Sequence, residues 1–325
     1  MHVTSEEGGY TYKKSPKQML PQLRKDFDLI ESSTPEMTVC GLYVVTDPDK
    51  IVEITIRYMN VNCESGGLMA FVDGWELNGQ YFPGVEDHEL NLDKRIIEFC
   101  NDNKHWPLKQ FHRVYRSSQN AALLQYRIPI RGQFVATVRF IHNPNPCNIM
   151  AGEVSPIYNL INVGKRNNCT LTALYPAVVS IKNVNVGGTE QHLSYDCEQN
   201  KQDRIVVGGS NGLDSSNMEK SSSVCGHSEK AGPEQGIFCG VTSVRLSSSG
   251  NYVNTAVISI RPADESDIAI ATLGFAYVND SISLQPECLF FLNRSTQLGI
   301  YYINVRSRRN KEGYQKIVVI FLGLQ

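Results

Sequence analysis

The nine cysteines are the residues whose type and spacing indicate a definite chemistry. Cysteines form disulfides or hold metals, but no C-x-x-C pair and no finger-type cysteine–histidine spacing occurs, which disfavours a structural zinc site. Pairing the last eight in chain order closes four local loops, each worth about 3–4 kcal/mol in the chain-entropy model. This order joins Cys63 to Cys100, Cys147 to Cys169, Cys197 to Cys225 and Cys239 to Cys288, and leaves Cys40 unpaired.

Cysteine spacing alone leaves this connectivity open, because eight cysteines allow roughly 100 pairings. A second interpretation also stays open, in which all the thiols are reduced in a cytosolic protein. Residues 1–9 contain neither the basic nor the apolar segment of a secretion signal. We therefore expect that sequence is missing upstream of Met1, and that the missing part holds the signal peptide and the partner of Cys40.

The sequence contains no arrangement typical of catalysis. It has no H-E-x-x-H, no P-loop, and no G-x-G-x-x-G after a strand. The seven histidines are scattered without i, i+4 pairs. His88 lies in the polar cluster 87–89, which is typical of a solvated loop, and Asp73 before Gly74 suits a turn. We expect no enzymatic activity, no catalytic residue and no cofactor.

Four aromatic residues are candidates for contacting a ligand. Trp75 and Trp106 could anchor a peptide, because buried aromatic side chains dominate binding energies at interfaces. Tyr10 and Tyr12 would serve equally well if exposed. Packing within the fold explains each of the four at least as well. The residues that bind a ligand are therefore unknown from the sequence.

Composition describes an ordinary globular protein of 325 residues, of which 41% are hydrophobic and 20% charged, with a net charge of −2. This length suffices for about two domains. The near-neutral charge favours neither a nucleic acid nor an anionic membrane as partner. No apolar run reaches the ~18 residues that a membrane span needs, and the apolar stretch 317–322 is far too short.

Short strand patterns separated by turn residues must position the cysteines. The pattern is strongest at 51–58, 67–74, 121–128 and 132–141, where Phe134, Ala136, Val138 and Phe140 share one face. It resumes at 170–175, 178–181, 204–209, 242–246 and 255–260. The only helix-like stretches are short, at 21–31 and 92–99. The spacing predicts an all-β protein built from antiparallel sandwiches.

Two prolines in His142-Asn143-Pro144-Asn145-Pro146 interrupt the strand pattern and predict a domain boundary there. We expect one domain over 1–143, a second over 144–289, and a tail over 290–325 with no domain of its own. The two halves share an order of cysteines, strands and Gly-rich turns, which indicates a weak internal duplication.

Several segments, in order, resemble the corticotropin-releasing factor-binding protein family, secreted glycoproteins that sequester peptide hormones. They span about 5–262, so the resemblance is specific. In the first half the matching segments are Phe71-Val72-Asp73-Gly74-Trp75, Asp87-His88-Glu89-Leu90, Ile97-Glu98-Phe99-Cys100 and Arg116-Ser117-Ser118-Gln119-Asn120. In the second half they are Asn168-Cys169-Thr170, Tyr175-Pro176, Gly212-Leu213-Asp214 with Met218, and Ser248-Ser249-Gly250-Asn251-Tyr252-Val253-Asn254.

The resemblance implies two CUB-like β-sandwich domains with consecutive local disulfides, which supports the pairing in chain order. It implies that the first cysteine of the family lies just before Met1, and so that Cys40 lacks its partner here. It also implies a glycan at Asn168, in the sequon Asn168-Cys169-Thr170. The calcium-binding CUB domains carry an Asp shortly after their third cysteine; segment 63–67, Cys-Glu-Ser-Gly-Gly, lacks it. We predict no metal site.

The resemblance implies a secreted, extracellular protein that binds and sequesters a CRF-like or diuretic-hormone-type peptide and limits its signalling. Such a peptide is an amphipathic helix, which an apolar groove would accept. The alternative is a CUB-type extracellular accessory or adhesion module that binds another protein. A cytosolic interaction protein fits the N-terminus but not the cysteines. The tail 290–325 has no counterpart in the family.

Overall fold

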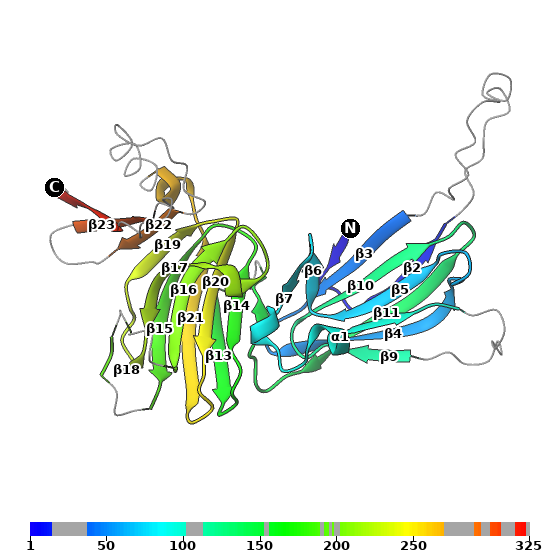
Figure 1. Cartoon of the computed structure of the whole chain (residues 1–325), viewed down its shortest axis with the longest axis horizontal. Coiled ribbons are helices and arrows are strands. Elements are labelled where there is room, and N and C mark those ends of the chain that lie inside the picture. The colour runs from blue at the N-terminus through cyan, green and yellow to red at the C-terminus, as the bar shows by residue number, and fades with distance from the viewer. Residues whose placement is uncertain are drawn as a thin grey trace, which may run out of the picture. The chain divides into compact units, whose positions relative to one another are not determined.

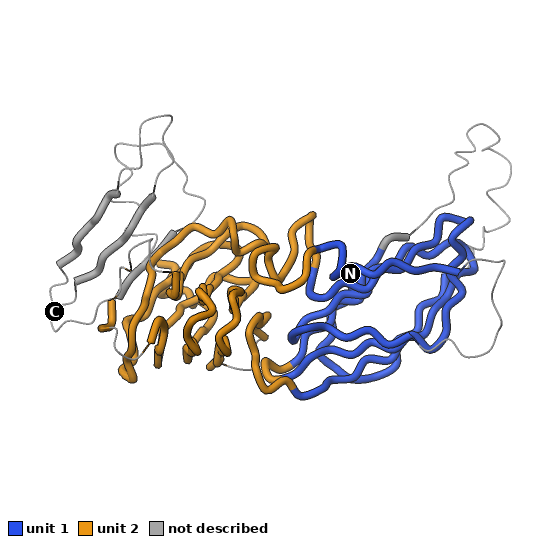
Figure 2. Tube along the Cα trace, turned by 60° about the horizontal axis from the view of Figure 1, so that its bottom comes forward, with its two compact units in different colours: residues 1–46, 50–75, 92–142 blue, residues 47–49, 76–91, 143–325 orange. Residues whose placement is uncertain are grey.

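The computed structural model describes most of the chain in two compact units. Described are residues 1–14, 38–101, 113–152, 156–188, 192–194, 197 and 202–269, together with the strands at 289–293, 300–306 and 316–322. Unit 1 comprises 1–46, 50–75 and 92–142, and unit 2 comprises 47–49, 76–91 and 143–325 (Figure 2). The sequence led us to expect two contiguous domains. In the structure, residues 76–91 instead belong to unit 2, although the segments on either side of them belong to unit 1.

Unit 1 is a sandwich of a five-stranded and a four-stranded sheet (Figure 1). The first sheet has the order β1-β3-β10-β5-β8, with the bounds β1 His2–Thr4, β3 Thr38–Val45, β10 Ala121–Ile128, β5 Leu68–Asp73 and β8 Ile96–Phe99. The second has the order β2-β11-β4-β9, with the bounds β2 Gly8–Lys13, β11 Gln133–His142, β4 Lys50–Asn60 and β9 Arg113–Arg116. Pairing is antiparallel except between β1 and β3.

Alternate residues of these strands form one core between the two sheets. In β11 the inward residues Phe134, Ala136 and Val138 are buried, as the alternation predicted. They meet the inward residues of β5 and β10, among them Phe71 and Leu124. The other faces of both sheets point away from this core.

Unit 2 is a second sandwich with the same plan. One sheet has the order β12-β14-β20-β16-β17, with the bounds β12 Ile149–Met150, β14 Cys169–Ala173, β20 Val241–Ser247, β16 Arg204–Ser210 and β17 Glu219–Val224. The other has the order β13-β21-β15-β19-β22-β23-β24, and β18 also pairs with β15. Its bounds are β13 Ile157–Val163, β21 Val253–Pro262, β15 Ala177–Val186, β19 Glu234–Phe238, β22 Leu289–Asn293, β23 Ile300–Arg306, β24 Lys316–Leu322 and β18 Gly226–Ser228. The predicted all-β fold of two antiparallel sandwiches is confirmed.

A hairpin and several short helical segments, one of them at 265–269, also belong to the described structure. Strands β6 (Trp75–Leu77) and β7 (Gln80–Phe82) are joined by Asn78-Gly79, whose φ angles of 54° and 78° suit the Asn-Gly hairpin turn. The 3-10 helices are η2 (Val85–Asp87) and η3 (Ser215–Asn217), and the α-helix is α1 (Leu92–Arg95).

The helix expected over 92–99 is only half correct, because α1 ends at Arg95 and β8 follows at once. The second half is Ile96-Ile97-Glu98-Phe99, which pairs with β5 along its whole length. β-Branched and aromatic side chains favour this pleated arrangement, and the tertiary pairing outweighs the helical pattern. The helix-like stretch 21–31 lies outside the described residues.

Candidate functional site

Where both cysteines lie in the described residues, disulfides join Cys63–Cys100, Cys147–Cys169 and Cys197–Cys225. These are three of the pairs expected from pairing in chain order. The first lies in unit 1 and the other two in unit 2. Cys239 is disulfide-bonded and buried, but Cys288 lies outside the described residues, so the fourth pair stays a prediction.

Cys40 carries the free thiol of the described part of the chain and is half-buried in β3. It lies directly opposite Tyr126 of β10. Burial raises the pKa of Tyr126 to about 12, and the electrostatic interaction with Cys40 is the second contribution. Tyr12 contacts the same ring at 5.0 Å between centroids. The thiol therefore lies at the edge of the unit 1 core.

The three aromatic candidates that the structure describes pack within unit 1. Trp75 is 4% exposed; its Nε1–H donates to the Val44 carbonyl at 2.9 Å, and its ring meets Tyr43 edge-on at 5.2 Å. Tyr10 and Tyr12 are partly buried and pack against the unit 1 core. Packing thus accounts for these three residues. Trp106 lies outside the described residues.

Asp73 has a role in the structure of unit 1. Its Oδ1 accepts hydrogen bonds from the backbone N–H of Ser118 at 2.7 Å and from the Ser118 hydroxyl at 3.1 Å. Its backbone carbonyl accepts from Nε and Nη2 of the fully buried Arg95. The residue therefore ties the end of β5 to α1 and to the turn before β10.

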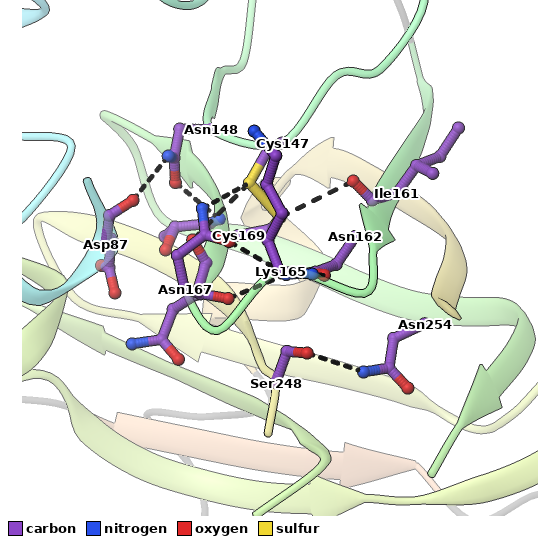
Figure 3. Close-up of a disulfide and its surroundings, with 12 residues drawn as sticks. Asp87, Cys147, Asn148, Ile161, Asn162, Lys165, Asn167, Cys169, Ser248 and Asn254 are labelled. Carbon is purple, nitrogen blue, oxygen red and sulfur yellow. Dashed lines mark hydrogen bonds between the residues drawn. A yellow bond between two sulfur atoms is a disulfide. The ribbon is translucent and has the colours of Figure 1, made fainter. Parts of the chain in front are cut away.

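A densely hydrogen-bonded polar site lies in unit 2, where Asp87 at the end of η2 is near the Cys147–Cys169 disulfide (Figure 3). Asp87 is completely buried, and its carboxylate accepts from Arg245 Nε at 2.7 Å and from the Ser215 hydroxyl. Asn148 Nδ2 donates to the Asp87 carbonyl at 2.7 Å, while Asn148 Oδ1 accepts from the Thr170 N–H at 3.0 Å. Interpreting the cluster 87–89 as a solvated loop is therefore wrong for Asp87.

Three further contacts secure the same segment. Arg245 Nη2 pairs with Glu86 at 2.9 Å, Lys165 pairs with Glu89 at 2.5 Å, and Asn168 Nδ2 donates to the Glu86 carbonyl at 3.2 Å. Burial alone would lower the pKa of Arg245, but the carboxylates of Asp87 and Glu86 raise it above its ordinary value. We call residues 84–89 the strap.

The Asp87 cluster is built for holding the chain together. Both oxygens of the Asp87 carboxylate accept hydrogen bonds, and the residue is completely buried, so the carboxylate serves packing contacts within unit 2. Across the described residues, no group of three or more His, Cys, Asp or Glu side chains could hold a metal ion. The absence of a calcium site stays a prediction. In the described part of the chain, no helix has the length and apolar character to cross a membrane.

Comparisons with known proteins cover both units. Residues 20–142 match the model of the "Corticotropin-releasing factor binding protein N-terminal domain", and residues 149–269 match that of the C-terminal domain. The corticotropin-releasing factor-binding protein of Xenopus laevis is 29% identical over 230 residues, 69% of this chain and 70% of that protein. The Homo sapiens protein of the same name is 29% identical over 228 residues, 68% of each chain.

Among solved structures, the CUB1-EGF-CUB2 domains of rat MASP-1 are similar with 9% identity and a TM-score of 0.25, covering 80% of this chain and 100% of that one. The full extracellular region of zebrafish Gpr126/Adgrg6 is similar with 11% identity and a TM-score of 0.25, covering 82% of this chain and 37% of that one. Likeness at this level supports no conclusion about the fold or the function.

Proposed function

This chain belongs to the corticotropin-releasing factor-binding protein family, and we propose that it is an extracellular protein that binds a CRF-like peptide hormone. Binding lowers the concentration of free hormone and so limits occupancy of the hormone's receptor. The activity is stoichiometric and includes no chemical step. The curated relatives are themselves binding proteins by name, which agrees with this class of function.

The observation that carries the proposal is the match of both family domains, in order and without overlap, over 20–142 and 149–269. The match to each domain falls largely on one compact unit, and each unit has its own hydrophobic core. Disulfides within each unit limit its unfolding and keep its surface preformed. A preformed surface loses little conformational entropy on binding a peptide, which favours high affinity.

The disulfides also support an extracellular location, because such bonds persist in oxidising compartments. We expect Cys239 to pair with Cys288 in the secreted protein. Mapping of peptides under non-reducing conditions tests all four pairs; recovery of Cys239 or Cys288 joined to any other cysteine would refute the pairing in chain order.

Asn168 is the proposed glycosylation site. Its side chain is partly exposed at the start of β14, next to the disulfide-bonded Cys169. Its Nδ2 uses one N–H in the contact with Glu86, so the second is available for the glycan bond. Expression in a eukaryotic secretory system should give a mass that falls on enzymatic removal of N-glycans, and the fall should be smaller in the Asn168→Gln variant.

The direct test of function is titration of the secreted, full-length protein with labelled corticotropin-releasing factor or a related diuretic peptide. We expect saturable binding with a 1:1 stoichiometry and a Kd well below micromolar. A scrambled peptide of the same composition is the control for non-specific binding. Absence of saturable binding up to micromolar concentrations would refute the proposal. Competition against a receptor in a cell assay then tests whether binding lowers signalling.

A further inference from the structure

The outer face of the five-stranded sheet in unit 1 carries a depression of about 110 Å³. It is lined by Leu68, Ala70, Gln125, Tyr126 and Arg127, from the neighbouring strands β5 and β10. Leu68 and Ala70 alternate with the core residues Met69 and Phe71, so their side chains point away from the core. We call this depression the side-chain pocket.

Small residues keep the floor of the side-chain pocket low. Gly41, Gln125 and Ala70 lie directly opposite one another on β3, β10 and β5 and form one row across the sheet. A Cβ atom at Gly41 would come within 2.8 Å of the side chains of both Leu123 and Tyr43, so a larger residue there would force these neighbours to shift. The neighbouring row consists of the larger, buried side chains of Tyr43, Leu123 and Val72.

Arg127 lines the side-chain pocket, and Glu98 on the adjacent strand β8 carries the opposite charge. Arg127 on β10 donates through Nε to the Gly66 carbonyl at 2.7 Å, which fixes the guanidinium and leaves its Nη groups for a ligand. Glu98 lies opposite Ala70 on β8 and is exposed. Within the part of the chain that the structure describes, neither Arg127 nor Glu98 forms an ion pair.

Size and charge together define what the pocket would accept. An apolar cavity of about 150 Å³ holds one benzene molecule, so the side-chain pocket suits a single aliphatic side chain. A carboxylate beside that side chain would pair with Arg127 in the geometry that guanidinium groups favour. A cation on the opposite side would meet Glu98.

We propose that the side-chain pocket anchors the peptide ligand by one aliphatic side chain, with an acidic neighbour toward Arg127 and a basic neighbour toward Glu98. This assignment rests on the proposed function, since it names where the bound peptide makes contact. Nothing in the family match distinguishes this surface. The assignment depends only on the depth, the floor and the rim charges of this face.

The first variant is Ala70→Leu, which fills the pocket from its floor. Losing burial of one aliphatic side chain should weaken binding of labelled corticotropin-releasing factor roughly 10- to 100-fold. The matched control is Thr11→Leu, which adds a leucine at an exposed position on the other sheet of unit 1. Thermal unfolding and mapping of the Cys63–Cys100 disulfide check that both variants fold.

The second variant, Arg127→Met, keeps the aliphatic stem and removes the charge. It should weaken binding roughly two- to fivefold, and the loss should shrink as salt concentration rises. Alanine substitutions along the peptide then identify the side chain that enters the pocket. At one aliphatic position of the peptide, alanine should lower the affinity for the wild-type protein but not the affinity for the Ala70→Leu variant.

The outcomes separate the two proposals. Wild-type protein that does not bind overturns the proposed function and the pocket assignment together. Binding by wild type with equal affinity in folded Ala70→Leu and Arg127→Met overturns the pocket assignment alone. An equal loss in Ala70→Leu and Thr11→Leu also overturns it, because the effect would then not be specific to the pocket.

Discussion

Replacing Asp87 by asparagine should destabilise unit 2 and leave unit 1 unchanged. The substitution keeps the side-chain shape but removes the negative charge that faces Arg245 at 2.7 Å. The Asp87 side chain is 0% exposed and that of Arg245 is 14% exposed, so the pair is shielded from water. Removing one partner of such a pair costs about 3–5 kcal/mol, because the other charge stays buried without compensation.

Glu86 reduces the expected loss, since it also pairs with Arg245 at 2.9 Å and would remain. Its side chain is 67% exposed, so its contribution is screened and small. We therefore expect about 3 kcal/mol for Asp87→Asn, at the lower end of the range for buried pairs. For a unit of this size, this corresponds to a fall of about 6–12 °C in the Tm of unit 2.

Hydrogen exchange by mass spectrometry is the assay, because it reports each unit separately. Exchange should accelerate in the strap and in strands β14 and β20, while the amides of β10 and β11 keep their protection. Glu86→Gln is the matched control, with an expected cost of about 0–1 kcal/mol. A loss below about 1 kcal/mol for Asp87→Asn, or equal losses in both variants, would refute the idea that a buried charge pair holds the strap.

Three further predictions concern other contacts. Trp75→Phe should lower the free energy of unfolding by about 1–3 kcal/mol, because the buried Val44 carbonyl loses its hydrogen-bond donor. Peptide affinity should stay unchanged; a loss of affinity in a folded variant would contradict a purely packing role for Trp75. Cys147→Ser with Cys169→Ser should cost about 2–5 kcal/mol, whereas Cys40→Ser should not lower the Tm comparably. Burial raises the pKa of Tyr126 and Tyr158 from 10.0 to about 12, so both stay neutral in the folded state while the unfolded state ionises. The stability that they contribute is complete below pH 10 and falls between pH 10 and about pH 12. A spectrophotometric titration of the folded protein in which every tyrosine ionises with a pKa near 10 would contradict this.

The β-sandwiches could be predicted from the sequence because alternation is a local signal. The period of two in β11 places Phe134, Ala136 and Val138 inward, and no distant residue needs to be known for that inference. The stretch 92–99 was ambiguous for the same reason: its local pattern suits a helix, and only pairing with β5 turns its second half into β8.

The polar site could not be predicted, because it depends on residues far apart in the sequence. Asp87 and Arg245 are separated by 158 positions, and no local pattern brings them together. A charged residue among other polar residues is most simply interpreted as part of a solvated loop. Asp87 is buried instead, because its partner Arg245 comes from a distant strand. The side-chain pocket was missed for a related reason: Ala70 and Gly41 carry no recognisable chemistry, and their importance lies in the space that they leave.

The strap has a practical consequence for dissecting this protein. Cutting the chain between its two halves would leave residues 76–91 with the N-terminal fragment, although they complete unit 2. The N-terminal fragment would expose an apolar and acidic segment without its acceptor surface, and the C-terminal fragment would present Arg245 without Asp87. The two fragments are therefore expected to be poorly soluble alone and to recover when co-expressed. Although the protein contains two sandwiches, neither half of the sequence contains all of unit 2, so the whole chain is the sensible piece to express.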